Sequence, residues 1–337
     1  MKYYPRQAVW ETTLKCNMNC LHCGSKAGKE RNNELSTDEC INIAQQLIDM
    51  GLEEITLIGG EIFLKKDWDK ISRKFVDNGV RTNIITNAFN LKDENFEQIK
   101  NSGVCQVYIS VDGLEETHNK IRRNPYSFEH VLKVMKRLRE EKIPIGVVTT
   151  ITNLNVNELE GMYELFKDNN VYSWQLQLAS PMGNARENGQ LLISVDKVPY
   201  LTKFVREKNS LGEMIVVAGD NIGYYDENDR YIRGEGRGIW KGCQAGKFVV
   251  GIDSIGNVKG CESLQDDKFI EGNLRKNTLK EIWNRKGAFS YNRDFVPSML
   301  KGKCKGCDKG FICAAGCRQL SYFTTDDKYE NIYCCYK

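Results

Sequence analysis

Three cysteines stand close together near the start of the chain, in the run CNMNCLHC. Cys16, Cys20 and Cys23 follow the apolar stretch AVWETT with the spacing C-x3-C-x2-C, which suits one cubane iron–sulfur cluster. Because three thiolates leave one iron without a protein ligand, a substrate or cofactor can bind that iron directly. The run therefore indicates a cluster that takes part in chemistry. A zinc knuckle or a chance group of cysteines is the alternative.

The other cysteines are unevenly placed along this chain of 337 residues. None of the thirteen cysteines lies in residues 106–242, whereas eight lie between Cys243 and Cys335. This asymmetry predicts two domains, residues 1–225 and residues 226–337.

Composition constrains the compartment and the kind of partner. The N-terminal run MKYYPRQAVWETT has no long apolar core or small-residue cleavage site, and no run approaches membrane-spanning length. We therefore expect a cytoplasmic protein with no membrane partner, whose reduced and clustered thiols point to metal rather than disulfides. A net charge of +3 is too small and too dispersed to indicate binding to nucleic acid.

The first two-thirds of the chain alternates strand and helix patterns, which predicts an α/β fold with parallel strands joined by right-handed crossovers. We expect strands at residues 8–13, 54–58, 81–86, 106–111, 145–150 and 173–178. One intervening helix begins with a capping box in which Ser36 pairs with Glu39, and another begins with Asn155 ahead of Glu158. Six such units are too few for a closed eight-stranded barrel of the usual kind.

Unusual residues fall where the expected strands end. After the cysteine loop of the first strand come, strand by strand, Gly59, Gly60 and Glu61; Thr86 and Asn87; Ser110 and Asp112; Thr149 and Thr150; and Ser180 and Pro181. In parallel βα folds the carboxyl ends of the strands meet at one rim, where sites are built. The pattern predicts a functional site at this rim, although Gly59 and Gly60 are also compatible with an ordinary tight turn.

The C-terminal cysteines form a second pattern. Its members are Cys243, Gly256 after twelve residues, Cys261 after four more, the C-x2-C-x5-C-x3-C run of Cys304, Cys307, Cys313 and Cys317, and the pair Cys334 and Cys335. A zinc ribbon could use the four cysteines of that run, but it would leave the other cysteines unexplained. Cys40 and Cys105 fit neither pattern, and we interpret both as small apolar core residues.

These motifs resemble those of the radical S-adenosylmethionine (radical SAM) enzymes that carry a C-terminal SPASM domain. The first run has their spacing with His22 before the third cysteine, and the C-terminal run reproduces the seven-cysteine SPASM pattern. The resemblance implies an open, partial (β/α)6 barrel followed by a small cysteine-rich domain, with S-adenosylmethionine and three 4Fe–4S clusters as cofactors. It also implies reductive cleavage of S-adenosylmethionine to a 5′-deoxyadenosyl radical, which abstracts hydrogen from an unactivated C–H bond.

By the same resemblance, each cluster has its own set of cysteines. The radical SAM cluster takes Cys16, Cys20 and Cys23, the first auxiliary cluster takes Cys243, Cys261 and Cys317, and the second takes Cys304, Cys307, Cys313 and Cys334. The first auxiliary cluster then needs a fourth ligand from a further side chain, water or the substrate. Cys335 could replace Cys334 through a small loop shift.

The resemblance also assigns contacts to S-adenosylmethionine, namely His22, Gly59, Gly60, Glu61, Asn87, Ser110, Asp112 and Arg122. Glu61 would hold the ammonium group of the methionine moiety, and Arg122 would bind its carboxylate through two nitrogens. The sequence departs from the family pattern at Ala88, Asn119 and Arg123. An ordinary surface arginine is the alternative for Arg122.

Members with this layout mostly mature ribosomally made peptides, so the resemblance implies an oxidoreductase that crosslinks a peptide through a thioether or C–C bond. The expected partners are the peptide and a flavodoxin- or ferredoxin-type reductant. Because the cysteine loop begins at residue 16, we expect no leader-binding domain before it. A separate leader-binding protein is then one route to recognition of the peptide.

Glu262 directly follows the second SPASM cysteine, where sulfatase maturases place an acidic base. It is therefore the candidate catalytic proton acceptor, and a surface glutamate at the end of a hairpin is the alternative. Three other functions stay open. They are epimerisation or dehydrogenation of a small molecule such as an aminoglycoside, sulfatase-maturase-like oxidation of Cys or Ser, and a non-catalytic iron–sulfur carrier.

Overall fold

The computed structural model describes residues 3–234 and 238–336. Ten strands of these residues form one sheet, in the order β10-β9-β8-β1-β2-β3-β4-β5-β6-β7. The strands are β1 (Gln7–Glu11), β2 (Glu54–Ile58), β3 (Arg81–Thr86), β4 (Gln106–Ser110), β5 (Ile145–Ile151), β6 (Ser173–Leu178), β7 (Ile215–Ala218), β8 (Val249–Ile252), β9 (Asn257–Lys259) and β10 (Gly272–Asn273). The run from β8 to β7 is parallel, and β9 and β10 add an antiparallel edge.

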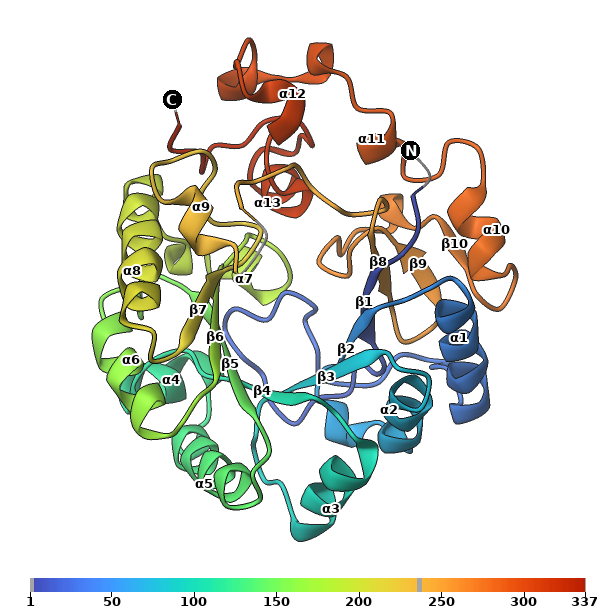
Figure 1. Cartoon of the computed structure of the whole chain (residues 1–337), viewed down its shortest axis with the longest axis vertical. Helices are drawn as coiled ribbons and strands as arrows, with labels where there is room; N and C mark the ends of the chain where they lie inside the picture. Colours follow the sequence, from blue (N-terminus) through green and yellow to red (C-terminus); the bar gives the residue numbers. More distant parts are fainter. Residues whose placement is uncertain (1–2, 235–237, 337) are drawn as a thin grey trace.

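The sheet is strongly curved, and helices cover its outer face (Figure 1). The helices are α1 (Thr37–Asp49), α2 (Trp68–Val76), α3 (Asp93–Ser102), α4 (Glu115–Arg122), α5 (Ser127–Glu140), α6 (Leu159–Asp168), α7 (Asn184–Glu187), α8 (Val198–Leu211), α9 (Asp229–Ile232), α10 (Leu279–Asn284), α11 (Ser290–Arg293), α12 (Gly310–Cys313) and α13 (Arg318–Thr325). The predicted α/β class with a parallel sheet and a C-terminal cysteine-rich region is confirmed.

Alternation of side chains along each strand separates the core from the inner face of the sheet. Trp174 of β6 points outward, where its ring packs edge-on against Phe166 of α6 and Phe204 of α8. Its neighbours Gln175 and Gln177 point the other way and are half-buried. Since side chains of a strand alternate between two faces, the apolar set lies under the helices and a polar set lines the inside of the curve.

The six expected strands lie where the sequence predicts them, but two more parallel strands were missed. The short runs at 215–218 and 249–252 form β7 and β8 at the two sides of the parallel region. Strand β8 pairs with β1, with Gln7 opposite Val249, so the cysteine-rich region extends the same sheet. The domain division after residue 225 therefore stays a prediction.

The two predicted helix starts have different outcomes. Ser36 and Glu39 form the capping box of α1, with both reciprocal bonds present. Asn155 does not cap α6, for which Glu158 is the N-cap residue. The side-chain amide of Asn155 instead donates to the carbonyls of Asp112 at 3.1 Å and Thr150 at 2.9 Å. The amide is used at the strand ends because two buried carbonyls there need a donor.

The two unassigned cysteines also differ. Cys40 is fully buried in α1, as expected of a small core residue. The expectation for Cys105 is wrong, because this residue is exposed. Its backbone N–H bonds to the Thr82 carbonyl at 2.8 Å just before β4, while the side chain faces solvent. In the described ranges, no helix is long and apolar enough to cross a membrane.

Candidate functional site

The loop that follows β1 carries Cys16, Cys20 and Cys23 and lies across the inner side of the sheet (Figure 1). The three thiols are close enough to influence one another electrostatically. Burial raises the pKa of Cys16 to about 12 and also raises the pKa of Cys20. Thiols buried in this way ionise only opposite a strong cationic partner, such as the iron of a cluster.

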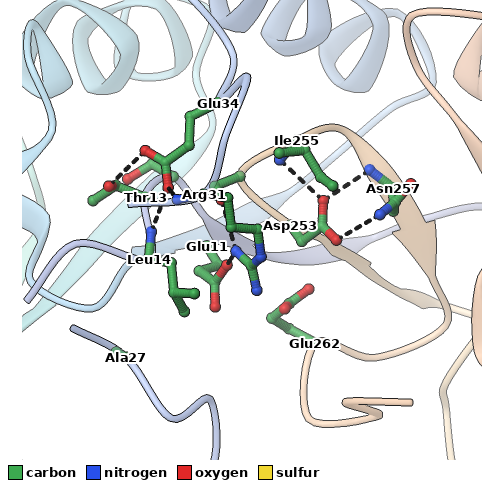
Figure 2. Close-up of polar contacts among 12 residues, drawn as sticks. Glu11, Thr13, Leu14, Ala27, Arg31, Glu34, Asp253, Ile255, Asn257 and Glu262 are labelled. Atoms are coloured by element: carbon green, nitrogen blue, oxygen red, sulfur yellow. Dashed lines mark hydrogen bonds and ion pairs between the residues drawn. The ribbon is translucent and has the colours of Figure 1, made fainter. Parts of the chain in front are cut away.

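Glu34 fixes the beginning of this loop. Its carboxylate accepts hydrogen bonds from Thr13 Oγ1 at 2.7 Å, from the Leu14 N–H at 2.7 Å and from the Arg31 N–H at 3.2 Å (Figure 2). A carboxylate that receives two backbone donors and a hydroxyl holds both ends of a loop in one geometry. Sequence reasoning missed Glu34, which no motif marks.

Gly59 and Gly60 are required by a close approach of the backbone. A side chain at Gly60 would place its Cβ 2.4 Å from the Lys15 carbonyl oxygen, and one at Gly59 would lie 2.9 Å from that of Thr13. The Gly60 N–H donates to the Thr13 carbonyl at 2.7 Å, and the Glu61 N–H donates to that of Lys15 at 2.8 Å. The turn after β2 therefore supports the cysteine loop directly, so it is more than a connection between strand and helix.

Glu61 connects the ends of β2 and β3. The side chain is 2% exposed and accepts bonds from Thr86 Oγ1 at 2.8 Å, the Asn87 N–H at 2.8 Å and the Phe63 N–H at 3.3 Å. Burial raises the pKa of Glu61, and these donors oppose that shift. Asn87 Nδ2 lies 3.8 Å from Cys16 Sγ, so the pair Glu61 and Asn87 reaches the first thiol of the loop.

Asp112 lies between two other predicted site residues. Its carboxylate is 2.7 Å from His22 Nε2, 2.5 Å from Arg122 Nη2 and 2.9 Å from the Thr150 N–H. Burial by itself would raise the pKa of Asp112, but Arg122 and His22 hold it well below its ordinary value. Arg122 is 8% exposed and its Nη1 lies 3.7 Å from Cys20 Sγ, so it is not an ordinary surface arginine.

His118 is a further buried partner of this group. Its Nδ1 is 3.1 Å from the Asp112 N–H, and its Nε2 is 2.9 Å from Ser127 Oγ. Burial, together with the charge of Arg122, lowers the pKa of His118 to about 3, so the imidazole is neutral. Ser110 ends β4 nearby, half-buried on the inner face.

The turn after β6 holds the other end of the cysteine loop. Gly183 has φ +52°, and a Cβ there would lie 2.3 Å from the Cys23 carbonyl oxygen. Asn184 donates its N–H to that carbonyl at 2.9 Å and its side-chain amide to the Cys20 carbonyl at 2.9 Å. The loop is thus bonded from β2, β3 and β6, which are far apart in the sequence.

The C-terminal thiols gather in two places. Cys304, Cys307, Cys313 and Cys334 line one cavity, and Cys335 is not among its lining residues, which favours Cys334 over Cys335 as a ligand. The other set is Cys243, Cys261 and Cys317, whose thiols influence one another electrostatically. Burial raises the pKa of Cys261 to about 11 and that of Cys317 well above its ordinary value. In the part of the chain that the structure describes, no three His, Cys, Asp or Glu side chains are arranged for a single metal ion.

Comparison with known proteins agrees with this arrangement of thiols. A model of the radical SAM superfamily matches residues 10–166, and a model of the SPASM iron–sulfur cluster-binding domain matches residues 243–308. The sequence is also 30% identical to the AdoMet-dependent heme synthase of Methanosarcina barkeri, over 99% of this chain and 97% of the relative. The chain belongs to the radical SAM superfamily and carries a SPASM domain.

This radical SAM protein is similar to further members. It is 26% identical to the PqqA peptide cyclase of Bradyrhizobium diazoefficiens, over 96% of this chain and 84% of the relative. Its fold matches the crystal structure of Streptococcus suis SuiB bound to S-adenosylmethionine with a TM-score of 0.78 and 18% identity, over 99% of this chain and 78% of that one. S-adenosylmethionine and iron–sulfur clusters are therefore cofactors of this protein, and the number of clusters stays a prediction.

Glu262 of the radical SAM protein is buried, so the interpretation as a surface glutamate is wrong. The residue is 3% exposed, and its Oε1 accepts from Lys259 Nζ at 3.0 Å and from Gln265 Nε2 at 2.9 Å. Its Oε2 has no hydrogen-bond partner among the described residues. Burial raises the pKa of Glu262 to about 8, against the opposing charge of Lys259.

Glu11 and Arg31 form an ion pair beside Glu262, at the junction of the barrel with the SPASM domain (Figure 2). Arg31 also donates to Ser254 Oγ at 2.7 Å. In the turn between β8 and β9, the Asp253 carboxylate accepts hydrogen bonds from the backbone N–H and the side-chain amide of Asn257. Sequence reasoning missed this group because Glu11 sits inside an apolar run. Period-two alternation marks it as an inward-facing position of β1.

The residues around the N-terminal cysteine loop suit S-adenosylmethionine. Arg122 Nε is buried and has no partner in the described residues, although Nη1 and Nη2 are engaged. A free guanidinium donor next to the Cys20 thiol is what a ligand carboxylate at the open iron would need. Ordinary packing leaves few such buried donors unpaired.

Proposed function

We propose that this radical SAM/SPASM protein oxidatively modifies a ribosomally made peptide by forming a thioether or C–C crosslink. When bound, S-adenosylmethionine and the three clusters supply a 5′-deoxyadenosyl radical and an acceptor for the electron that the substrate loses. The cysteine sets assigned above would hold the clusters. A flavodoxin- or ferredoxin-type protein would supply the reducing electron.

Residues of the rim would bind and orient S-adenosylmethionine. Glu61 would meet its ammonium group and Arg122 its carboxylate, with Gly59, Gly60, Asn87 and Ser110 around them. Asp112 is saturated by His22, Arg122 and Thr150, so we assign it and His22 to positioning of Arg122. Because the Asp112 carboxylate is fully buried, it would act by holding Arg122 in place.

The lining of the inner face is the observation that carries the choice of a peptide. Tyr108 and Ser110 of β4, Thr150 of β5, and Gln175 and Gln177 of β6 are half-buried on the side opposite the helices. Gln177 Nε2 donates to Thr150 Oγ1 at 3.2 Å. Hydroxyl and amide groups of this kind match the donors and acceptors of a peptide backbone, and none of the five carries a charge.

Glu262 would accept the proton that the substrate loses as the crosslink forms. One oxygen is held by Lys259 and Gln265, which fixes the carboxylate, and the other oxygen remains available in the described part of the chain. Because Glu262 directly follows Cys261, this base would lie beside the first auxiliary cluster.

Haem synthesis is the second candidate, favoured by 30% identity over nearly the full length of the Methanosarcina barkeri enzyme. Tetrapyrrole substrates carry several carboxylates, which proteins usually bind with Arg or Lys. The uncharged lining of β4 to β6 supports a peptide over such a substrate.

Mass spectrometry after co-expression tests the choice of substrate. The protein is expressed with short peptides encoded beside its gene, and reconstituted protein is separately incubated with Fe-coproporphyrin III, S-adenosylmethionine and dithionite. A peptide lighter by two hydrogens supports the proposal. Haem formation, or an unchanged peptide mass with one solvent deuterium, would overturn it in favour of haem synthesis or epimerisation. An iron–sulfur carrier would form no 5′-deoxyadenosine in either reaction.

A further inference from the structure

Arg318 occupies an unusual position for a charged side chain. It directly follows Cys317 and is the first residue of α13, and its exposed fraction is 0%. Nη1 donates to the carbonyls of Ala314 and Lys328, the second at 2.9 Å. The guanidinium carbon lies 4.8 Å from the Tyr329 ring centroid and 5.4 Å from that of Phe295.

The charge of Arg318 is not balanced by the protein groups that surround it. Nε and Nη2 have no hydrogen-bond partner among the described residues, and no carboxylate of those residues pairs with the guanidinium. Carbonyl oxygens and aromatic rings offset only part of the cost of burying a full positive charge. A buried arginine in this state needs an anion nearby.

The start of α13 adds to the positive potential at the same place. Cys317 is the N-cap residue of α13, so the helix N-terminus lies at this cysteine, and Arg318 is the next residue. The groups that interact electrostatically with Arg318 are the thiols of Cys243 and Cys317 and the phenols of Tyr329 and Tyr291. Two of the three cysteines of the first auxiliary set therefore lie in the field of this cation.

Tyr291 offers a second unused donor at the same thiols. Its hydroxyl is buried and has no hydrogen-bond partner in the described ranges. It interacts electrostatically with Cys243 and Cys261, and a Cβ at Gly260 would lie 2.1 Å from its oxygen. Arg318 and Tyr291 together present three unpaired donor atoms around one set of cysteines, Cys243, Cys261 and Cys317.

We propose that Arg318 is the counter-cation of the first auxiliary cluster and that Arg318 and Tyr291 donate hydrogen bonds to its sulfur atoms. Both are positioning residues, which act on the cluster and not on the substrate. Because a positive charge and sulfur hydrogen bonds stabilise the more negative, reduced state, they raise the reduction potential of that cluster. A raised potential suits a cluster that accepts an electron from the substrate. The inference rests on the proposed ligand role of Cys243, Cys261 and Cys317.

An EPR-monitored redox titration of three anaerobically reconstituted variants tests this inference. Arg318→Met removes the charge while keeping an apolar side chain of similar length, and it should shift the potential of the first auxiliary cluster to a more negative value. Arg318→Lys keeps the charge and should give a smaller shift in the same direction, and Tyr291→Phe should also give a smaller one. Loss of iron from about twelve to about eight atoms per folded Arg318→Met chain would likewise support the inference.

Arg293→Met is the matched control. Arg293 also has an unpaired Nη2 in the described residues and stacks on aromatic rings, but the groups that interact with it most strongly are Glu271, Tyr3, Tyr291 and Asp294, none of them a thiol. Its replacement should leave the potential unchanged. Unaltered potential and iron content in the folded Arg318→Met variant would overturn the inference. If Arg318→Met does not fold, unchanged potentials in both Arg318→Lys and Tyr291→Phe would overturn it.

The same titration separates failure of the inference from failure of the ligand assignment. Cys261→Ala should remove the EPR signal of the first auxiliary cluster. If it removes no signal, the ligand assignment is wrong and the inference falls with it. If the signal disappears with Cys261→Ala but does not respond to either Arg318 variant, only the inference is wrong.

Discussion

Two buried arginines lie beside cysteine thiols in this protein, and their charges are balanced differently. Arg122 pairs with the Asp112 carboxylate at 2.5 Å and approaches Cys20 Sγ at 3.7 Å. Arg318 follows Cys317 and pairs with no carboxylate of the described residues. The first guanidinium is neutralised by a carboxylate of the protein, whereas the groups that interact most strongly with the second are the thiols of Cys243 and Cys317 and the phenols of Tyr329 and Tyr291.

This difference indicates two ways of building a cluster site. The N-terminal loop is bonded by Glu34, by the turn after β2 and by Asn184, so its shape is fixed by protein groups alone. The first auxiliary set brings together Cys243, Cys261 and Cys317, which are distant in sequence, and unpaired donors lie around this set. The barrel rim is therefore preorganised, whereas on the proposed ligand assignment the SPASM domain would depend on its clusters for charge balance.

The largest effect on either cluster site is expected when the thiols of the N-terminal loop are removed. Replacing Cys16, Cys20 and Cys23 together by Ala should lower iron and sulfide by about a third and abolish formation of 5′-deoxyadenosine, because the open iron is lost. The loop should keep its fold, since Glu34 and Asn184 do not use the thiols. Iron analysis and chromatography of the reaction measure both effects. Residual 5′-deoxyadenosine from the triple variant would contradict the assignment of this site.

The next test separates cleavage of S-adenosylmethionine from completion of the product. Cys261→Ala should still form 5′-deoxyadenosine at a rate close to wild type but should fail to yield the modified peptide, because oxidation of the substrate needs the first auxiliary cluster. Cys335→Ala is the matched control, as this thiol does not line the cavity of the second set. It should behave like wild type in both assays. A complete product from Cys261→Ala would argue for a redox-neutral reaction.

Removal of the clusters by a chelator tests the preorganisation itself. In hydrogen exchange followed by mass spectrometry, the apo protein should lose protection mainly in residues 243–336, where thiols and the Arg318 charge lose their partner. Residues 7–123 should lose less, because Asp112 and Glu34 keep their bonds. Equal loss of protection in both regions would remove the distinction between them.

Local patterns in the sequence predicted the thiol sites and most of the fold. Cysteine spacing and strand alternation are short-range signals, so β1 to β6, the capping box at Ser36 and the thiol loop followed from them. Strands β7 and β8 were missed because four-residue apolar runs are ambiguous without their neighbours. The pairing of β8 with β1 is a contact between distant segments that no local pattern encodes.

The polar partners of the sites were the least predictable part. Glu34 and Arg318 carry no motif of their own, and their importance arises from which backbone groups and thiols they face. Cys105 was expected in the core, but a cysteine just before a strand can point to either side. The role of Glu262 stays a prediction, and its burial was not foreseen because it depends on Gly251, where a Cβ would lie 2.3 Å from the Glu262 nitrogen.

Asp112→Asn tests the balance of the N-terminal arginine. Leaving Arg122 buried without its carboxylate should cost about 3–5 kcal/mol of unfolding free energy at pH 7. Since Arg122 and His22 hold the pKa of Asp112 below its ordinary value, the contribution is present above about pH 4, the unfolded-state value, and is lost as the pH falls further. Denaturant unfolding at pH 7 and pH 3 should therefore show a smaller difference at pH 3.

Asp229→Asn is the control for that variant. Asp229 is a buried carboxylate that pairs with Arg233 at 2.8 Å, away from the cysteine loop. It should lose comparable stability and keep the affinity for S-adenosylmethionine, whereas Asp112→Asn should also weaken that affinity. Equal affinities in the two variants would mean that Asp112 does not position Arg122 for the cofactor.

Glu61→Gln carries the smallest expected effect and addresses one contact within the preorganised rim. Loss of the charged partner of the cofactor ammonium should weaken binding of S-adenosylmethionine by about 1.5–3 kcal/mol, or roughly ten- to a hundredfold. The clusters should remain, because no thiol is changed. Glu54→Gln is the matched control, since Glu54 lies at the opposite end of β2 and bonds to Gln7 and Asn83. If equilibrium binding gives the same affinity for Glu61→Gln as for Glu54→Gln, Glu61 serves only to join β2 to β3 through Thr86 and Asn87.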